Sequence, residues 1–248
     1  MEGSYSELLS KFAAMMKKAI VVGASSGLGR EVALLLREQG WTVGVAVRRV
    51  DRLADFELRA QIDVTADDAG RQLLQLVERV GGMDLYFHAS GIGHQNRELK
   101  EDIELQTTET NAVGFTRMVG TAYRYMSEHG GGHIAVISSI AGTKGLGPAP
   151  SYSATKALQN AYVEALEQLA NARKLNISFT DIRPGFVDTD LLNDGNRYPL
   201  LLNKERVARD IVRSIVKRRH VRVIDWRWRA ITWLWHRIPR CIWRRLRL

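Results

Sequence analysis

The sequence predicts an α/β fold, a doubly wound parallel sheet of seven strands with helices on both faces. Short apolar runs alternate with segments of helical periodicity, the pattern of a parallel sheet whose strands are buried on both sides. The chain has 248 residues, of which 45% are apolar, so it can bury a large core. The sequence shows no internal repeat or long linker that would divide it.

The strand-like runs are short and rich in aliphatic residues. After the first run, Val32, Leu35 and Leu36 recur at helical spacing, and Gly40 is a suitable place for that helix to stop. Similar helical patterns separate the later runs. The strands are expected at residues 20–22, 42–47, 61–63, 85–87, 134–137, 178–182 and 221–224.

A glycine-rich turn joins the first strand to the first helix, with the sequence Gly23-Ala24-Ser25-Ser26-Gly27-Leu28-Gly29. Glycines let backbone N–H groups and the helix N-terminus approach a pyrophosphate with no side chain in the way. Strand, glycine turn and helix in this order predict a dinucleotide site in a Rossmann fold. A tight glycine turn without a ligand is the alternative for this segment taken alone.

Tyr152 and Lys156 form a candidate proton-transfer pair. Their spacing of four residues puts a phenol and an ammonium on one face of a helix. A free Tyr has a pKa of about 10. A cation one turn away favours the phenolate, so we expect Lys156 to lower the pKa of Tyr152. Taken alone, the pair could also be a chance arrangement on an exposed helix.

The glycine spacing Gly-x-x-x-Gly-x-Gly resembles that of the short-chain dehydrogenase/reductase family, in its single-domain form. Further matches to the family's motifs follow in order as far as Thr189. They are Asp63-Val64 after the third strand, Asn111 in a helix, Ser139 at the end of a strand, Tyr152 with Lys156, and the segment Pro184-Gly185-Phe186-Val187-Asp188-Thr189. The resemblance implies an NAD(P)-dependent oxidoreductase that interconverts a carbonyl and an alcohol.

The resemblance also implies a role for each matching side chain. Tyr152 would give a proton to the carbonyl oxygen or take it from the alcohol, and Ser139 would bind the same oxygen. Lys156 would depress the pKa of Tyr152 and hold the nicotinamide ribose. Asn111 would distort its helix and support a water path to Lys156. The expected cofactor contacts are Gly23, Ser25, Ser26, Gly27, Leu28, Gly29, Arg48, Arg49, Asp63, Val64, Ala89, Gly91, Lys156, Pro184, Gly185, Val187 and Thr189; no metal site is expected.

One segment departs from the family's pattern. Where the family usually has Asn-Asn-Ala-Gly after the fourth strand, this chain has His88-Ala89-Ser90-Gly91. We expect His88 to act as a substitute hydrogen-bonding side chain, with a structural role favoured over a catalytic one. The missing amides also keep a rival open, a non-catalytic NADP-binding redox sensor or scaffold protein.

The second strand favours NADP over NAD. In sites for NAD, an acidic residue at the end of this strand binds the ribose 2′-hydroxyl and repels a 2′-phosphate. Here the strand is followed by Arg48 and Arg49, whose guanidinium groups can bind a phosphate through two hydrogen bonds. A solvated loop is the alternative, and the nearby Asp51 keeps NAD open.

The basic charge of the chain is concentrated at its C-terminal end. Residues 217–248 carry eleven Lys and Arg against one Asp, a net charge of +10, whereas the whole chain carries +9. If this end is helical, apolar and basic residues fall on opposite sides, and Pro239 divides it into two short helices. The expected apolar side is Trp228, Ile231, Trp235, Ile238, Ile242 and Leu246, and the expected basic side is Arg229, Arg237, Arg240, Arg244 and Arg247.

An anionic membrane surface and a packing or subunit interface are the two main readings of this end. The arginines interrupt the apolar run well before about 20 residues, so it cannot span a bilayer. An acidic acyl carrier protein is a further option. Nucleic acid is disfavoured, because nothing else in the chain supports it. The family resemblance itself implies a homodimer or homotetramer acting on a small-molecule substrate.

The expected parts of the chain are an N-terminal extension (residues 1–16), a dinucleotide-binding catalytic domain (17–225) and the basic C-terminal segment (226–248). Ser4 and Glu7 fit a capping box, and Met15 or Met16 could be the true start in place of Met1. With a lone cysteine, Cys241, and no secretory signal, the cytoplasm is expected, peripheral at the inner face of the membrane if lipid binds. Leucines within residues 186–203 suggest an apolar lid and a lipophilic substrate.

Overall fold

Seven parallel strands form one sheet in the order β3-β2-β1-β4-β5-β6-β7. The computed structural model describes residues 17–53, 55–192 and 198–246. The strands are β1 (Lys18–Val22), β2 (Thr42–Val47), β3 (Arg59–Gln61), β4 (Leu85–His88), β5 (Gly132–Ile137), β6 (Ile177–Arg183) and β7 (Val221–Val223). The predicted doubly wound α/β fold is confirmed.

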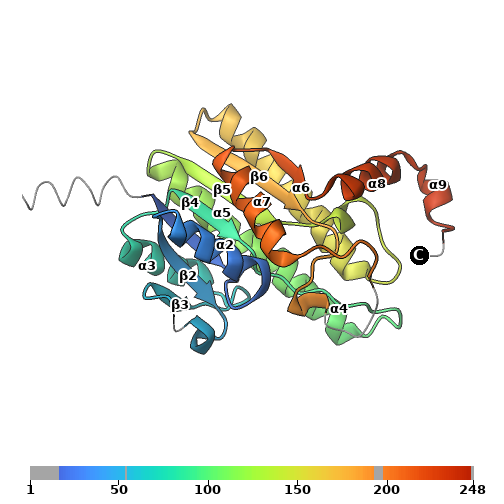
Figure 1. Cartoon of the computed structure of the whole chain (residues 1–248), viewed down its shortest axis with the longest axis horizontal. Coiled ribbons are helices and arrows are strands. Elements are labelled where there is room, and N and C mark those ends of the chain that lie inside the picture. The colour runs from blue at the N-terminus through green and yellow to red at the C-terminus, as the bar shows by residue number, and fades with distance from the viewer. Residues whose placement is uncertain (1–16, 54, 193–197, 247–248) are drawn as a thin grey trace, which may run out of the picture.

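Helices cover both faces of the sheet (Figure 1). Helices α2 (Gly27–Glu38) and α7 (Lys204–Val216) pack on one face, and α3 (Ala69–Val80), α5 (Phe115–Glu128) and α6 (Pro150–Ala172) pack on the other. The remaining helices among the described residues are α4 (Glu101–Thr108), α8 (Trp226–Arg237) and α9 (Arg240–Trp243). Short 3-10 segments are η1 (Val50–Leu53), η3 (Ile140–Thr143) and η4 (Asp190–Leu192), and η2 (Glu109–Gly114) is a π-helix.

The side chains of β1 explain why the fold has two apolar clusters. Side chains alternate across a strand, so Ala19 and Val21 point to the face covered by α2 and α7. Ile20 and Val22 point to the face covered by α3 and α5. All four are essentially buried, as expected for a central strand of a parallel sheet covered on both sides.

The third strand was expected at residues 61–63, but it lies at Arg59–Gln61. Asp63 leaves the sheet because its carboxylate accepts hydrogen bonds from the backbone N–H (3.0 Å) and hydroxyl (2.7 Å) of Thr65, which turns the chain. The strand lies at the edge of the sheet, and the side chains of Arg59 and Gln61 are exposed. Such a strand lacks the apolar run from which the others were predicted.

The C-terminal segment divides at Pro239 as predicted, since α8 ends at Arg237 and Pro239 is the N-cap of α9. Its apolar residues do not share one surface. Trp228 is buried in the core cluster, with Ile231 and Trp235 packed beside it. Ile242, which lies in α9 beyond the break at Pro239, is instead 52% exposed. Figure 1 shows α8 and α9 at the opposite end of the molecule from α3 and β3.

Some expectations fall on residues outside the described part of the chain. The N-terminal extension, with its capping box, and residues 193–197 of the expected lid are among them. Within the described part of the lid segment, Leu202 is buried and Leu201 is exposed. No helix among the described residues is long and apolar enough to cross a membrane.

Two buried histidines in neighbouring strands are held in the neutral form. Burial lowers the pKa of His88 in β4 to about 3, and the Lys156 ammonium acts in the same direction against a weaker opposing effect of the Ser90 backbone. Burial also lowers the pKa of His133 in β5 to about 4, with Arg218 adding to the effect. Both pKa values lie below the value of 6.5 for a free His. At pH values between the native pKa and the unfolded pKa of these histidines, the unfolded chain binds more protons than the native protein. The free energy of unfolding therefore falls as the pH falls.

We therefore expect the free energy of unfolding to decrease as the pH is lowered from 7 to 5. A group protonated only in the unfolded state contributes up to about 1.4 kcal/mol per pH unit. The substitution His88→Asn should make the decrease shallower by about 1 kcal/mol per pH unit near pH 5.5. Urea unfolding at a series of pH values measures this slope. The exposed His236 offers the control His236→Asn, and equal slopes for the two variants would contradict the burial argument.

Candidate active site

The predicted catalytic residues come together where strands β4 and β5 end and helix α6 begins. Ser139 follows β5 and is the N-cap of η3, while Tyr152 and Lys156 lie in the first two turns of α6. Asn111 lies in the π-helix η2. Pro150 occupies the first turn of α6, where a missing backbone N–H costs no hydrogen bond.

The Tyr152 ring is half-buried and packs closely on Gly93, and its hydroxyl meets Ser139. A Cβ added to Gly93 would lie 2.7 Å from ring atoms of Tyr152, so only glycine allows the backbone to approach the ring this closely. The Ser139 side chain hydrogen-bonds the phenol, which lowers its pKa, and its oxygen also accepts the N–H of Ala141 at 3.1 Å. These two residues of the expected site are therefore direct partners.

The expected lowering of the Tyr152 pKa by Lys156 is not found. Burial raises the pKa of Tyr152 above 10.0, and the hydrogen bond from Ser139 offsets this only in part. The Lys156 Nζ lies 5.7 Å from the centre of the Tyr152 ring. Its hydrogen bonds go elsewhere, to the carbonyl oxygen of Ile137 at 3.0 Å and to Oε1 of Gln159 at 2.9 Å. Tyr152 is consequently a neutral phenol at neutral pH.

Lys156 is a buried cation with a weakened hold on its proton. Burial lowers its pKa from 10.5 to about 8, although the negative charge of Asp181 opposes the change. Asp181 is itself buried in β6, where it accepts hydrogen bonds from Ser138 and from Arg183. A lysine in this state can exchange a proton with a neighbouring group near neutral pH.

Asn111 clamps the loop that follows β4. Its side chain accepts the N–H of Ile92 at 2.9 Å and donates to the carbonyl of Ile92 at 2.7 Å. Asn111 lies in the π-helix η2, and its backbone carbonyl oxygen accepts a hydrogen bond from Nε2 of Gln159 at 2.8 Å. The helix distortion that the sequence predicts at Asn111 is therefore present as η2.

Gln159 was missed by the sequence analysis. It is fully buried and joins Lys156 to Asn111, accepting from the first and donating to the second. The signal that could have found it is a polar residue three positions after Lys156, on the buried side of a helix. Buried side-chain amides need partners for both ends, and catalytic polar groups are the partners available there.

The glycine turn has the geometry that an anionic ligand needs. Gly23 and Gly27 have φ values of +92° and +58°, which other residues rarely adopt. A Cβ on Gly23 would come within 2.4 Å of the Ser90 nitrogen, so the turn packs against the segment after β4. Ser26 is the N-cap residue of α2, but its side chain makes no capping hydrogen bond. The first turn of α2 also contains no acidic residue. The turn therefore fits a dinucleotide phosphate at the helix N-terminus.

Other expected cofactor residues gather around this turn. A Cβ on Gly27 would touch Thr189 at 3.4 Å, and one on Gly91 would lie 3.2 Å from the Asn111 side chain. Burial raises the pKa of the Asp63 carboxyl. Two hydrogen bonds from Thr65 and the charge of the nearby Arg48 act in the opposite direction and together lower this pKa below its ordinary value. The adjacent Arg49 is exposed directly after β2.

Ser25, Leu28, Val64 and Ala89 are further expected cofactor contacts. Ser25 and Leu28 are half-buried in and just after the glycine turn. Val64 is buried, and the N–H of Ala89 donates to the carbonyl of Val22 at 2.8 Å.

The segment that follows β6 is fixed from two sides. The carbonyl of Pro184 accepts the N–H of Ile140 at 3.2 Å, and Val187 is buried in the core cluster. A Cβ on Gly185 would lie 2.3 Å from the Trp228 indole nitrogen, so helix α8 rests directly on this segment. The C-terminal helix thus supports the backbone at Gly185.

His88 occupies the departure from the family's pattern. Its Nδ1 shares a hydrogen bond of 2.8 Å with the Tyr86 hydroxyl, and its ring meets the edge of Phe115. With a pKa of about 3 it is neutral across the physiological range. A buried neutral imidazole held in this way agrees with a structural role.

The sheet order and the glycine turn between β1 and α2 define the class of dinucleotide-fold α/β proteins, with a Ser, Tyr and Lys grouped where the cofactor crevice opens. The short chain dehydrogenase family matches residues 17–198. The chain is 31% identical over 215 residues to an uncharacterized oxidoreductase of Myxococcus xanthus, covering 81% of this chain and 84% of the relative. An uncharacterized oxidoreductase of Listeria monocytogenes is 32% identical over 71% of this chain and 76% of its own.

The chain belongs to the short-chain dehydrogenase family of oxidoreductases. Solved structures agree with the fold. A short chain dehydrogenase from Burkholderia cenocepacia in complex with NADP aligns with a TM-score of 0.81 at 19% identity, covering 94% of this chain and 98% of that one. ElxO with NADP bound aligns with a TM-score of 0.75 at 22% identity, covering 87% of this chain and all of its own.

We expect Gln159→Leu to destabilise the protein by about 1–3 kcal/mol, because the Asn111 carbonyl and the Lys156 ammonium would each lose a buried hydrogen-bond partner. Urea unfolding at pH 7 measures the change. The control is Gln168→Leu, on the exposed side of the same helix, which should change stability by less than about 0.5 kcal/mol. Equal effects of the two substitutions would show that the bridge contributes nothing.

Proposed function

We propose that the protein is an NADP(H)-dependent oxidoreductase that interconverts a carbonyl and an alcohol by hydride transfer. The observation that carries the proposal is the hydrogen bond between the Ser139 side chain and the half-buried, protonated phenol of Tyr152, with Lys156 one helical turn away. A protonated phenol beside a second hydroxyl can donate to one carbonyl oxygen while the hydroxyl also binds it.

Each side chain then has a defined task. NADPH, when bound, supplies the hydride. Tyr152 donates its proton to the substrate oxygen, and the raised pKa keeps that proton in place until the oxygen becomes basic. Ser139 holds the oxygen in position. Lys156, with a pKa near 8, is suited to return a proton to the phenolate, and Gln159 and Asn111 orient its ammonium.

The choice of NADP rests on charge. Arg48 and Arg49 follow β2, at the place where the ribose 2′ position lies in this class of fold, and guanidinium groups bind phosphate strongly. The structures of the Burkholderia protein and of ElxO, which share the fold, contain bound NADP. The position of Arg48 beside Asp63 supports a shared adenosine-binding surface.

A lipophilic substrate is the finer part of the proposal. The described lid residues Leu200 and Leu202 pack against the core together with Phe186. Leu201 is exposed on the same segment, where it is available to an apolar ligand. The loop at residues 141–150, which follows Ser139, would form the facing wall.

The proposal extends to the oligomeric state of the enzyme, its compartment and its attachment to a membrane. A homodimer or homotetramer is the state expected for this family, and the cytoplasm is the expected compartment. Peripheral attachment to an anionic membrane through residues 226–248 is now confined to fewer side chains, because Trp228 and Trp235 pack on the domain. Trp226, Trp233 and Ile242 stay exposed among the arginines.

We expect Tyr152→Phe to abolish turnover and to leave NADPH binding intact, because only the phenolic oxygen is removed. NADPH oxidation is followed against a panel of aldehydes, ketones, quinones and acyl thioesters, and binding by cofactor fluorescence. Tyr162→Phe, on the same helix, is the control and should keep full activity. Cofactor binding by the native protein without turnover of any compound would favour the redox sensor or scaffold instead.

We also expect the double substitution Arg48→Ala with Arg49→Ala to weaken NADPH binding by at least about tenfold, the loss of about 1.4 kcal/mol of phosphate binding. NADH has no 2′-phosphate, so its affinity serves as the internal control and should change little. Calorimetric titration with both cofactors measures the ratio. A ratio that stays unchanged would mean that the two arginines form a solvated loop.

A further inference from the structure

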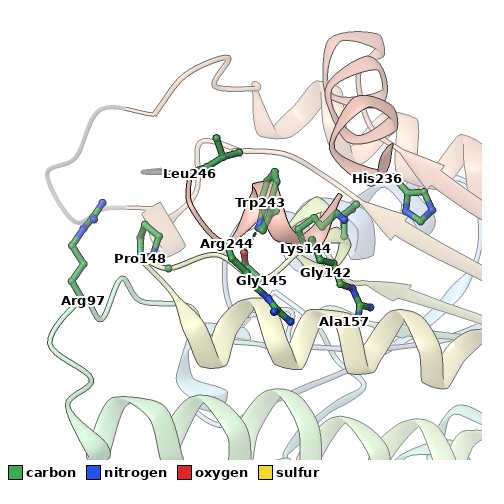
Figure 2. A pocket seen from close by; sticks show the side chains of 13 residues that line it. Arg97, Gly142, Lys144, Gly145, Pro148, Ala157, His236, Trp243, Arg244 and Leu246 are labelled. Atoms are coloured by element: carbon green, nitrogen blue, oxygen red, sulfur yellow. Dashed lines mark hydrogen bonds between the residues drawn. The ribbon is translucent and has the colours of Figure 1, made fainter. Parts of the chain in front are cut away.

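A large basic cavity lies between the C-terminal helices and the loop that precedes α6. Its volume is about 950 Å³. Figure 2 shows that its walls come from separate parts of the chain: Arg97 before α4, Lys144 and Pro148 before α6, Ala157 in α6, and His236 with Arg244 at the C-terminal end. None of Asn111, Ser139, Tyr152 and Lys156 lines it.

Defined contacts hold the walls of this basic cavity in place. The buried indole of Trp243 donates to the carbonyl of Gly145 at 2.8 Å, the dashed line in Figure 2. The Lys144 Nζ donates to the carbonyl of Ile238 at 3.0 Å. The rings of Trp235 and Trp243 pack edge to face, with centres 5.5 Å apart. The C-terminal segment is therefore attached to the loop by two hydrogen bonds, from Trp243 to Gly145 and from Lys144 to Ile238.

The charge of the lining has one sign. Arg97, Lys144, Arg240 and Arg244 surround the basic cavity together with His236, and none of the described lining residues is acidic. Within the described part of the chain, the guanidinium groups of Arg240 and Arg244 have no ion pair or hydrogen bond. Several cations around a concave surface without carboxylates create a positive potential that favours an anion.

The lining also has an apolar part. Trp243 and Leu246 lie on one side, and Pro148 and Ala157 lie near the loop and α6. Guanidinium groups bind phosphate through paired hydrogen bonds, and an indole offers a flat apolar surface to a hydrocarbon chain. The volume exceeds what a phosphate ion alone would fill, so the ligand should carry an organic group.

We propose that this basic cavity is a second binding site, which takes the phosphate-bearing head of an amphiphile and is separate from the expected dinucleotide site. Arg240 and Arg244 bind the phosphate, and Trp243 with Leu246 contacts the first carbons of the apolar chain. Ile242, the neighbour of Trp243 in the chain, is exposed.

Calorimetric titration with dihexanoyl phosphatidic acid, a soluble short-chain lipid, tests the proposal. The native protein should bind it, and dihexanoyl phosphatidylcholine, which has the same chains and no net charge, should bind at least about tenfold more weakly. The double substitution Arg240→Gln with Arg244→Gln should reduce the affinity for the acid by a similar factor. The matched control is Arg209→Gln with Arg213→Gln, on the exposed side of α7, which removes the same charge.

Absence of binding to the native protein, or equal loss of affinity in the two double variants, would overturn the proposal. Thermal unfolding of each variant checks that it is folded. The readout is binding, so it does not depend on the proposed reductase activity. Failure of the lipid-binding proposal therefore does not imply failure of the proposed reductase activity.

The phosphate could belong to a membrane lipid or to a soluble compound. Flotation with phosphatidylcholine vesicles, with and without phosphatidic acid, distinguishes these two sources. Flotation that requires phosphatidic acid and is lost only in the Arg240 and Arg244 variant assigns the basic cavity to a membrane headgroup. Binding of the short-chain lipid without flotation assigns it to a soluble phosphate compound. Flotation that is equal in both double variants, without calorimetric binding, would show general charge attraction and contradict a defined site.

Discussion

The paired hydrogen bonds between the Asn111 side chain and the backbone of Ile92 organise the candidate active site. They tie the loop after β4 to the π-helix η2. Within η2, the Asn111 carbonyl accepts a hydrogen bond from Gln159, and Gln159 holds the ammonium of Lys156. The π-helix η2 costs energy relative to a regular α-helix, but it contains the Asn111 carbonyl that holds Gln159. Gln159 in turn positions the buried ammonium of Lys156.

The burial of Lys156 is acceptable only because polar groups surround it. The ammonium has two oxygen acceptors, from Ile137 and Gln159, and it feels the negative charge of Asp181. Asp181 is balanced in turn by Arg183, with an N–O distance of 2.7 Å. Desolvation still outweighs these contacts, which is why the pKa of Lys156 falls. The site therefore stores a cation that releases its proton more readily than a surface lysine.

Much of the fold could be predicted from the sequence, because buried parallel strands are continuous apolar runs. The edge strand β3 was misplaced by two residues, since its exposed side chains carry no such signal. The spacing of Tyr152 and Lys156 was informative, but the direction of the Tyr152 pKa shift was not predictable, because it depends on burial rather than on spacing. The partnership of Gln159 with Asn111 joins two helices, and no local pattern reveals it.

The strand order also bears on how the chain reaches its native state. Strand β1 lies inside the sheet between β2 and β4, and its pairing with β4, in which Ala19 is opposite Leu85, joins segments far apart in the chain. Every neighbouring pair of strands is parallel and therefore needs a long crossover before it can form. Because loop closure must precede such contacts, folding should be slow compared with helical proteins of similar size. Until β4 arrives, one edge of β1 is unpaired and apolar, so intermediates in which β1 has paired only with β2 are the species most exposed to aggregation.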